Sequence, residues 1–154
     1  MPNQPSLKDV HELTLVDPKN KKAFALKDCE TRGDKLFENK KDAKASLEAD
    51  ALAINDLQDA LFASKAGSLL IVLQGIDTSG KDGATKEAFR YTSPLGMMVQ
   101  AFGKPTEEEL AHDYLWRLHK VTPRRGFITV FNRSQYEDVL VVKVRQLAPA
   151  KMVE

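Results

Sequence analysis

The sequence has few of the features that would assign it to a secreted, membrane or nucleic-acid-binding class. It has a single cysteine, Cys29, so no disulfide can form within the chain, which suits a reducing compartment. Its 23 basic and 22 acidic residues nearly cancel, so net charge gives no support for nucleic-acid binding. No apolar run approaches membrane-spanning length, and the first residues contain no signal-peptide core. We therefore expect a cytoplasmic protein without nucleic-acid or membrane partners.

The composition changes along the chain and separates a polar arm from one domain. A length of 154 residues is sufficient for a single domain with a hydrophobic core. Residues 1–38 are polar and interrupted by prolines, so we expect a loosely structured arm that wraps the core. Residues 39–154 carry the periodic patterns and are expected to form the folded domain.

A long amphipathic helix is predicted at the start of this domain, from about residue 40 to 64. Apolar residues recur there at steps of three and four and end before Gly67, which is expected to terminate the helix. The stripe favours packing on a sheet over binding a partner protein. Its members are Leu47, Ala51, Ile54, Leu57 and Leu61.

The rest of the chain alternates between strand and helix patterns. This alternation predicts an α/β fold with a parallel sheet sandwiched by helices. The first strand is apolar on both faces, which is typical of a buried strand. Thr106 and Glu109 form a capping-box signature. A last helix is expected to open near Ser134, although residues 139–144 have the composition of a strand, which is the alternative. The expected strands are 68–74, 97–102 and 127–131, and the expected helices between them are 81–91 and 106–120.

The loop after the first strand has the glycine spacing and the lysine of a phosphate-binding loop. Glycines allow several backbone N–H groups to face one anion, and the following helix adds its positive end. Asp82 occupies the usual position of a Ser or Thr, where it would bind a metal or cap the helix. The alternative is a tight turn without a ligand. The expected phosphate-binding residues are Gly75, Thr78, Ser79, Gly80, Lys81, Asp82 and Gly83.

A second polar group follows the third strand, at the same edge of the predicted sheet. Arg133 is placed to grip phosphate oxygens, and its alternative is a surface ion pair. Asn132 stands where many phosphate-loop proteins have an aspartate. Glu137 or Asp138 would restore the missing negative charge, or would merely favour the start of a helix.

Four motifs in this order resemble the second polyphosphate kinase family, whose members transfer phosphoryl groups between inorganic polyphosphate and nucleotides. The resemblance extends from Leu70 to Val144 and includes the preceding arm more weakly. It implies a phosphate-loop kinase fold over residues 39–154, Mg²⁺ as cofactor, and nucleoside mono- and diphosphates as further substrates. The motifs are residues 75–83, 104–106, 113–117 and 131–139.

The resemblance also implies roles for individual side chains. Asp77 would organise Mg²⁺, Lys81 would contact the transferred phosphoryl group, and Arg133 would bind phosphates, which makes these three the expected catalytic residues. Asn132 is similar to the subgroup that phosphorylates both mono- and diphosphates, in which Glu137 would serve the metal or the acceptor. Thr106 and Arg117 would help to hold the acceptor; their alternatives are helix capping and a helix-surface charge.

Members of this family are much longer than this chain and contain a lid and further strands. Without them, the strand at 68–74 is expected to become an edge of the sheet. Two hypotheses follow: a phosphotransferase completed by a second piece, such as a complementing C-terminal fragment, or a non-catalytic remnant that binds phosphates. A different small nucleotide kinase accounts less well for the later motifs. The resemblance implies a homo-oligomer for full-length members, and no residue of this sequence indicates the oligomeric state of the present chain.

Overall fold

A computed structural model describes residues 36–137 together with Lys8. The expected N-terminal arm, Asp138 and most of the helix expected after Ser134 lie outside the described residues; Tyr136 and Glu137 are helical. The chain divides into two compact units, Met1–Asp50 and Ala51–Glu154. None of the described helices is long and apolar enough to cross a membrane.

The long helix α2 has the predicted bounds, Lys40–Ser64. It begins where the Asn39 side chain accepts hydrogen bonds from the backbone N–H groups of the first turn, at 3.0 Å each. Its last residue is Ser64, and the next residue, Lys65, has a left-handed φ of 52° that terminates the helix. The expectation that Gly67 terminates it is therefore wrong.

The face of α2 that is buried within the second unit differs from the predicted stripe. Ala51 is fully buried, but Leu57 is 70% exposed, and the polar residue beside it, Gln58, is buried in its place. The Gln58 amide oxygen accepts a hydrogen bond from the backbone N–H of Ser93 at 3.2 Å. This contact accounts for a polar side chain at a buried position that the apolar periodicity does not predict.

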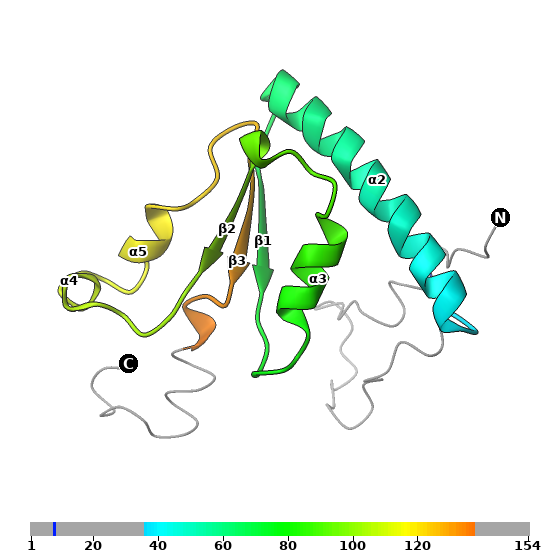
Figure 1. Ribbon diagram of the computed structural model, residues 1–154. Coiled ribbons are helices and arrows are strands. Elements are labelled where there is room, and N and C mark those ends of the chain that lie inside the picture. The colour runs from blue at the N-terminus through cyan, green and yellow to red at the C-terminus, as the bar shows by residue number, and fades with distance from the viewer. Residues whose placement is uncertain (1–7, 9–35, 138–154) are drawn as a thin grey trace. The chain divides into compact units, whose positions relative to one another are not determined.

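The sheet is parallel, as predicted, and its strand order is β1-β3-β2 (Figure 1). Ile71 and Val99 both lie opposite Val130, which fixes the register of the two outer strands on the central one. Helices α3 and α5 lie on opposite sides of the sheet (Figure 1). The strands are β1 (Leu69–Leu73), β2 (Met97–Ala101) and β3 (Ile128–Asn132).

Burial is greatest on the central strand β3. Its first four residues are buried, and Phe131 packs edge-to-face on Phe102, with ring centroids 4.8 Å apart. Strand β1 is an edge in the described sheet, as expected, and Leu69 is 46% exposed. The expectation that β1 is a buried strand is wrong for the described residues, because every residue of β1 is exposed or half-buried.

The segment expected to form one helix over 106–120 forms two short ones, α4 (Glu107–Leu110) and α5 (Trp116–His119). The predicted capping box of Thr106 and Glu109 is present at the start of α4. The helix breaks because the Asp113 carboxylate accepts a hydrogen bond from the N–H of Leu115 at 2.9 Å, which stabilises a local turn.

This break also separates the predicted apolar face of the segment. Leu118 is buried beside Phe131, whereas Leu110 and Tyr114 are 54% and 68% exposed. Upstream of it, α3 (Lys81–Ala88) is followed by a short 3-10 turn over Pro94–Gly96, which the Ser93 side chain caps.

Gly96, at the end of this 3-10 turn, supplies a test of the packing between α2 and the start of β2. A Cβ on Gly96 would lie 2.0 Å from the amide nitrogen of the buried Gln58 and 3.1 Å from the Phe62 ring. Gly96→Ala is expected to lower the free energy of unfolding by about 1–3 kcal/mol, measured by urea denaturation. Gly67→Ala is the control, since its Cβ would meet nothing within 4 Å. Equal stability of the two variants would contradict this packing.

Candidate phosphate-binding site

The loop between β1 and α3 is bent by two residues in the left-handed region. Thr78 has a φ of 66° and Gly80 a φ of 86°, and the N–H of Ser79 donates to the carbonyl of Ile76 at 3.1 Å. A Cβ on Gly75 would lie 2.6 Å from the Ser79 hydroxyl oxygen, so the loop closes tightly only over glycine. No side chain caps α3 at Gly80, which leaves its first N–H groups available to an anion.

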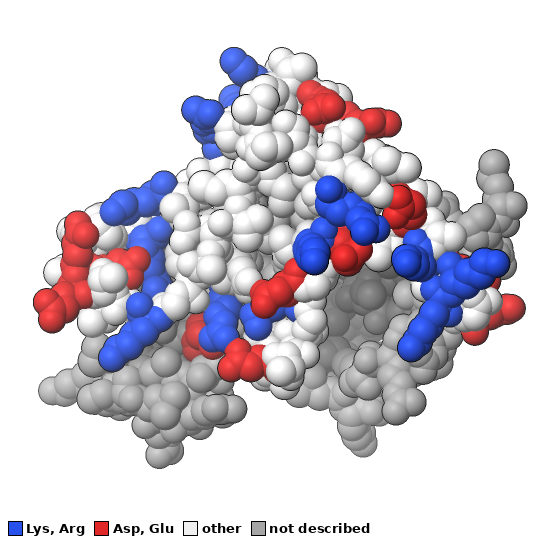
Figure 2. Space-filling model, viewed as in Figure 1, with Lys and Arg blue, Asp and Glu red and all other residues white. Residues whose placement is uncertain are grey.

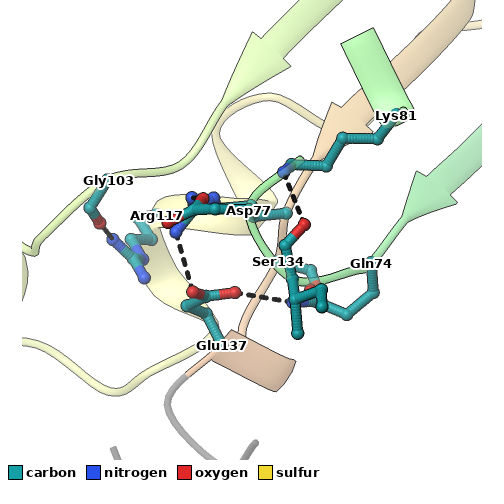
Figure 3. Close-up of polar contacts among 9 residues, drawn as sticks. Gln74, Asp77, Lys81, Gly103, Arg117, Ser134 and Glu137 are labelled. Carbon is teal, nitrogen blue, oxygen red and sulfur yellow. Dashed lines mark hydrogen bonds and ion pairs between the residues drawn. The ribbon is translucent and has the colours of Figure 1, made fainter. Parts of the chain in front are cut away.

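The Lys81 side chain folds back over this loop. Its Nζ donates to the Ile76 carbonyl at 3.4 Å, which places the ammonium group beside the bend (Figure 3). Lys81 is also the first residue of α3, so the helix and the charge lie at the same point. The predicted loop residues therefore form one short concave turn with a cation over it.

Arg133 reaches this turn from the end of β3. Its backbone N–H extends the pairing of β3 with β1 by donating to the Leu73 carbonyl at 2.9 Å. Its φ of 69° is left-handed, which turns the chain out of the strand. The guanidinium forms ion pairs with Asp77 and, at 2.7 Å, with Glu137. The expected approach of Arg133 to the loop is thus present, and its role toward phosphate stays a prediction.

Behind Arg133, a hydrogen-bonded group joins the ends of β1 and β3. Gln74 donates to Glu137 at 2.6 Å and accepts from the Ser134 hydroxyl at 3.1 Å (Figure 3). Ser134 is fully buried, and its hydroxyl oxygen also accepts from the N–H of Tyr136 at 3.2 Å. Sequence analysis missed Gln74 and Ser134 as site residues; the available signal was a polar residue at the end of an apolar run.

Asn132 and Asp82 form a second contact between β3 and the loop. The Asn132 amide nitrogen donates to the Asp82 carboxylate at 2.6 Å. The Asn132 amide oxygen is buried and accepts no hydrogen bond from the described residues. Asp82 lies in the first turn of α3 rather than at its N-cap, which is Gly80. The structure therefore shows Asp82 as a partner of Asn132 and not as a capping residue.

Two of the expected acceptor residues, Thr106 and Arg117, form hydrogen bonds within the fold. The Thr106 hydroxyl accepts from the N–H of Glu109 at 3.2 Å, within the capping box. Arg117 is 8% exposed and donates to the Gly103 carbonyl at 3.0 Å (Figure 3). Its guanidinium also lies over the Phe102 ring. The alternative that Arg117 is a helix-surface charge is wrong, because its guanidinium is buried. The acceptor role of both residues stays a prediction.

The described carboxylates fit a magnesium ion that is held partly by substrate. Among residues 36–137, no group of three His, Cys, Asp or Glu side chains gathers as a metal site. Mg²⁺ commonly takes one or two carboxylates and completes its shell with water and substrate phosphates. Asp77 is 83% exposed and its carboxylate lies at the loop, whereas both oxygens of Glu137 already accept hydrogen bonds. Asp77 is therefore the more available ligand.

Charge around the described residues is mixed in sign. Figure 2 shows Lys and Arg interspersed with Asp and Glu over the face in view, without a continuous region of one sign. Attraction of an anion to the loop therefore depends on the local cations Lys81 and Arg133 and on the backbone N–H groups of the turn.

Comparison with known proteins gives matches to one family. The model of the family described as Polyphosphate kinase 2 (PPK2) matches residues 37–154. An AMP/ADP-polyphosphate phosphotransferase of Meiothermus ruber is 45% identical over 84% of this chain and 49% of its own length. An ADP-polyphosphate phosphotransferase of Rhodopseudomonas palustris is 40% identical over 74% of this chain and 39% of its own.

A solved structure agrees with these sequence matches. The crystal structure of Polyphosphate Kinase 2 from Arthrobacter aurescens TC1 is similar with a TM-score of 0.77 and 37% identity, over 86% of this chain and 48% of that one. The chain thus spans half or less of the length of the relatives it matches.

The contact between Asn132 and Asp82 can be tested by a change of charge. Asn132→Asp replaces the hydrogen-bond donor by a carboxylate that faces the Asp82 carboxylate. Asn132→Ala removes the same bond without adding charge. We expect the Asp variant to be less stable than the Ala variant by about 1 kcal/mol at low salt, and the difference to shrink at high salt. Urea denaturation measures both, and an Asp variant as stable as the Ala variant at low salt would contradict the contact.

Proposed function

Because the chain belongs to the polyphosphate kinase 2 family, we propose that it moves phosphoryl groups between inorganic polyphosphate and nucleoside mono- or diphosphates, as part of a phosphotransferase. Its described residues have the α/β fold of that family, over part of the relatives' length. The observation that carries the proposal is the convergence of two cations on one turn: the Lys81 ammonium lies on the loop, and the Arg133 guanidinium pairs with Asp77 of the same loop.

The chemistry of such a transfer requires positioning and charge more than covalent catalysis. The N–H groups at the start of α3 would bind the oxygens of one phosphate, and Lys81 would neutralise part of its charge. Arg133 would bind a neighbouring phosphate with its planar pair of donors. An acceptor phosphate is already ionised at neutral pH, so no residue of the chain is needed as a nucleophile.

Magnesium, when bound, would offset charge on the phosphates and bridge their oxygens. We assign Asp77 as its ligand from the chain, with Glu137 as a second carboxylate close to Arg133. Asn132, Thr106 and Arg117 are proposed to serve the acceptor. The name of the Meiothermus relative includes both AMP and ADP, and we extend this breadth of acceptor to the present chain.

A second candidate function is binding of phosphates without transfer. It is favoured by one observation: the strand that leads into the loop, β1, is an edge with exposed apolar residues in the described sheet. A loop at the end of an edge strand has less support than one at the end of a central strand. The two candidates share the phosphate site and differ in turnover.

Lys81→Ala tests the phosphate site that both candidates require. We expect the Kd for polyphosphate to rise by about tenfold or more, because the variant loses a charge-assisted contact. Isothermal titration calorimetry at fixed salt measures the Kd. Lys86→Ala is the matched control, since Lys86 is an exposed lysine in the last turn of the same helix. Equal affinity of wild type and Lys81→Ala would exclude the loop as the phosphate site.

Turnover separates the two candidates. A coupled assay with polyphosphate, Mg²⁺ and AMP or ADP is run on this chain and on a version extended to the relatives' length. We expect weak binding and little turnover from this chain and rapid, Mg²⁺-dependent turnover from the extended version. Rapid turnover by this chain alone would contradict the expectation that turnover requires the segment that extends the chain to the relatives' length. An inactive extended version would favour binding without transfer.

A further inference from the structure

We infer that Gln74 and Ser134 are positioning residues for the Arg133 guanidinium: Ser134 holds the Gln74 amide, and Gln74 holds the Glu137 carboxylate that pairs with Arg133. The inference deepens the proposed function and rests on it for its consequence, because Arg133 is the proposed phosphate ligand. Gln74 contacts Glu137, Ser134 contacts Gln74, and Glu137 contacts Arg133. These contacts connect the two residues to the guanidinium through Glu137.

The Gln74 side chain has one orientation that satisfies both of its neighbours. Its amide oxygen accepts from the Ser134 hydroxyl at 3.1 Å, and its amide nitrogen donates to Glu137 at 2.6 Å. Rotation of the amide by half a turn would place its oxygen against the Glu137 carboxylate, where two acceptors repel. The negative charge of Glu137 thus sets the direction of the amide, and the amide in turn restrains the carboxylate.

The Ser134 hydroxyl holds the Gln74 amide in place. Ser134 is fully buried, and its hydroxyl uses both capacities: it donates to Gln74 and accepts from the backbone N–H of Tyr136. A buried hydroxyl with both partners present is held in one position, since moving it would leave polar groups unsatisfied.

Glu137 transmits the restraint to Arg133. One carboxylate oxygen accepts from Gln74 and the other accepts from Arg133 at 2.7 Å. The carboxylate cannot rotate without losing both contacts. Glu137 is 21% exposed in its side chain, whereas Asp77, the other partner of Arg133, is 83% exposed.

The two ion pairs of Arg133 are therefore unequal. The pair with Glu137 is braced by Gln74 and partly buried, and the pair with Asp77 is open to solvent, where ion pairs are weak. We infer that a substrate phosphate replaces Asp77 on the guanidinium while Glu137 remains bound. The hydrogen bond from Gln74 to Glu137 keeps the side of the guanidinium that pairs with Glu137 fixed, so its other side stays directed at the loop.

The first test observes the guanidinium itself. Arginine side-chain ¹H–¹⁵N spectra are recorded on the whole chain, and the Arg133 signal is identified by its loss in Arg133→Lys. In the wild type we expect hindered rotation of the Arg133 Nη groups. Gln74→Met keeps the length of the side chain but removes both hydrogen bonds, so in this variant we expect the Nη signals to be averaged by rotation. Gln100→Met is the control, because Gln100 lies in β2 and its amide donates to its neighbour, the carbonyl of Ala101. An Arg133 signal unchanged in Gln74→Met would overturn the inference.

The second test measures polyphosphate affinity in a double-mutant cycle. Gln74→Met is expected to raise the Kd about tenfold, and to add almost nothing in a Glu137→Gln background, because both changes release the same guanidinium. Ser134→Ala, which removes the hydroxyl that holds Gln74, should also raise the Kd. Additive losses in the cycle would show that Gln74 acts independently of Glu137 and would overturn the inference.

The two tests separate this inference from the proposed function. A wild-type chain that shows no affinity for polyphosphate would refute the proposed function. In that case the spectra of Arg133 still decide whether Gln74 positions the guanidinium.

Discussion

The ion pairs of Arg133 with Asp77 and Glu137 are the contacts on which the site depends. They exist because β1 and β3 are adjacent and parallel, so that the loop after β1 and the turn after β3 leave the sheet at the same edge. The pairing of Leu73 with Asn132 and the hydrogen bond from Arg133 to Leu73 set the offset between the two turns. A shift of one residue in this register would carry the guanidinium to the other side of the sheet.

The backbone at this edge adopts an unfavourable conformation. Thr78 and Arg133 are non-glycine residues in the left-handed region, at a cost of about 1–2 kcal/mol each. Nearby hydrogen bonds oppose this cost: Ser79 to Ile76 within the loop, and the Gln74–Ser134–Glu137 group behind Arg133. Such strain is typical of sites that direct a group at a ligand. Two of the three described non-glycine residues with a left-handed φ border this turn, and the third, Lys65, follows the end of α2.

Sequence patterns predicted the parts of the site that are local in the chain. The glycine spacing and Lys81 predicted the loop, and the position of Arg133 after an apolar strand, together with the rule for parallel sheets, predicted its approach. Gln74 and Glu137 form a hydrogen bond although more than sixty residues separate them in the sequence. No spacing rule predicts a contact at that range. The fold, like the site, was predictable from the sequence only where its features are local in the chain. The alternation of strands and helices and the bounds of α2 followed from periodicity, whereas the break at Asp113 and the burial of Gln58 in place of Leu57 depend on single hydrogen bonds to backbone N–H groups.

The central claim is that the turn over residues 75–83 binds phosphate with Arg133 at its side. Titration of the ¹⁵N-labelled chain with inorganic polyphosphate in the presence of Mg²⁺, followed by amide and guanidinium chemical shifts, tests it most directly. The account predicts that the largest shifts occur at the N–H groups of residues 75–83 and at the Arg133 guanidinium. Shifts confined to a different cationic segment, such as Lys40, Lys41 and Lys44 at the start of α2, would contradict it.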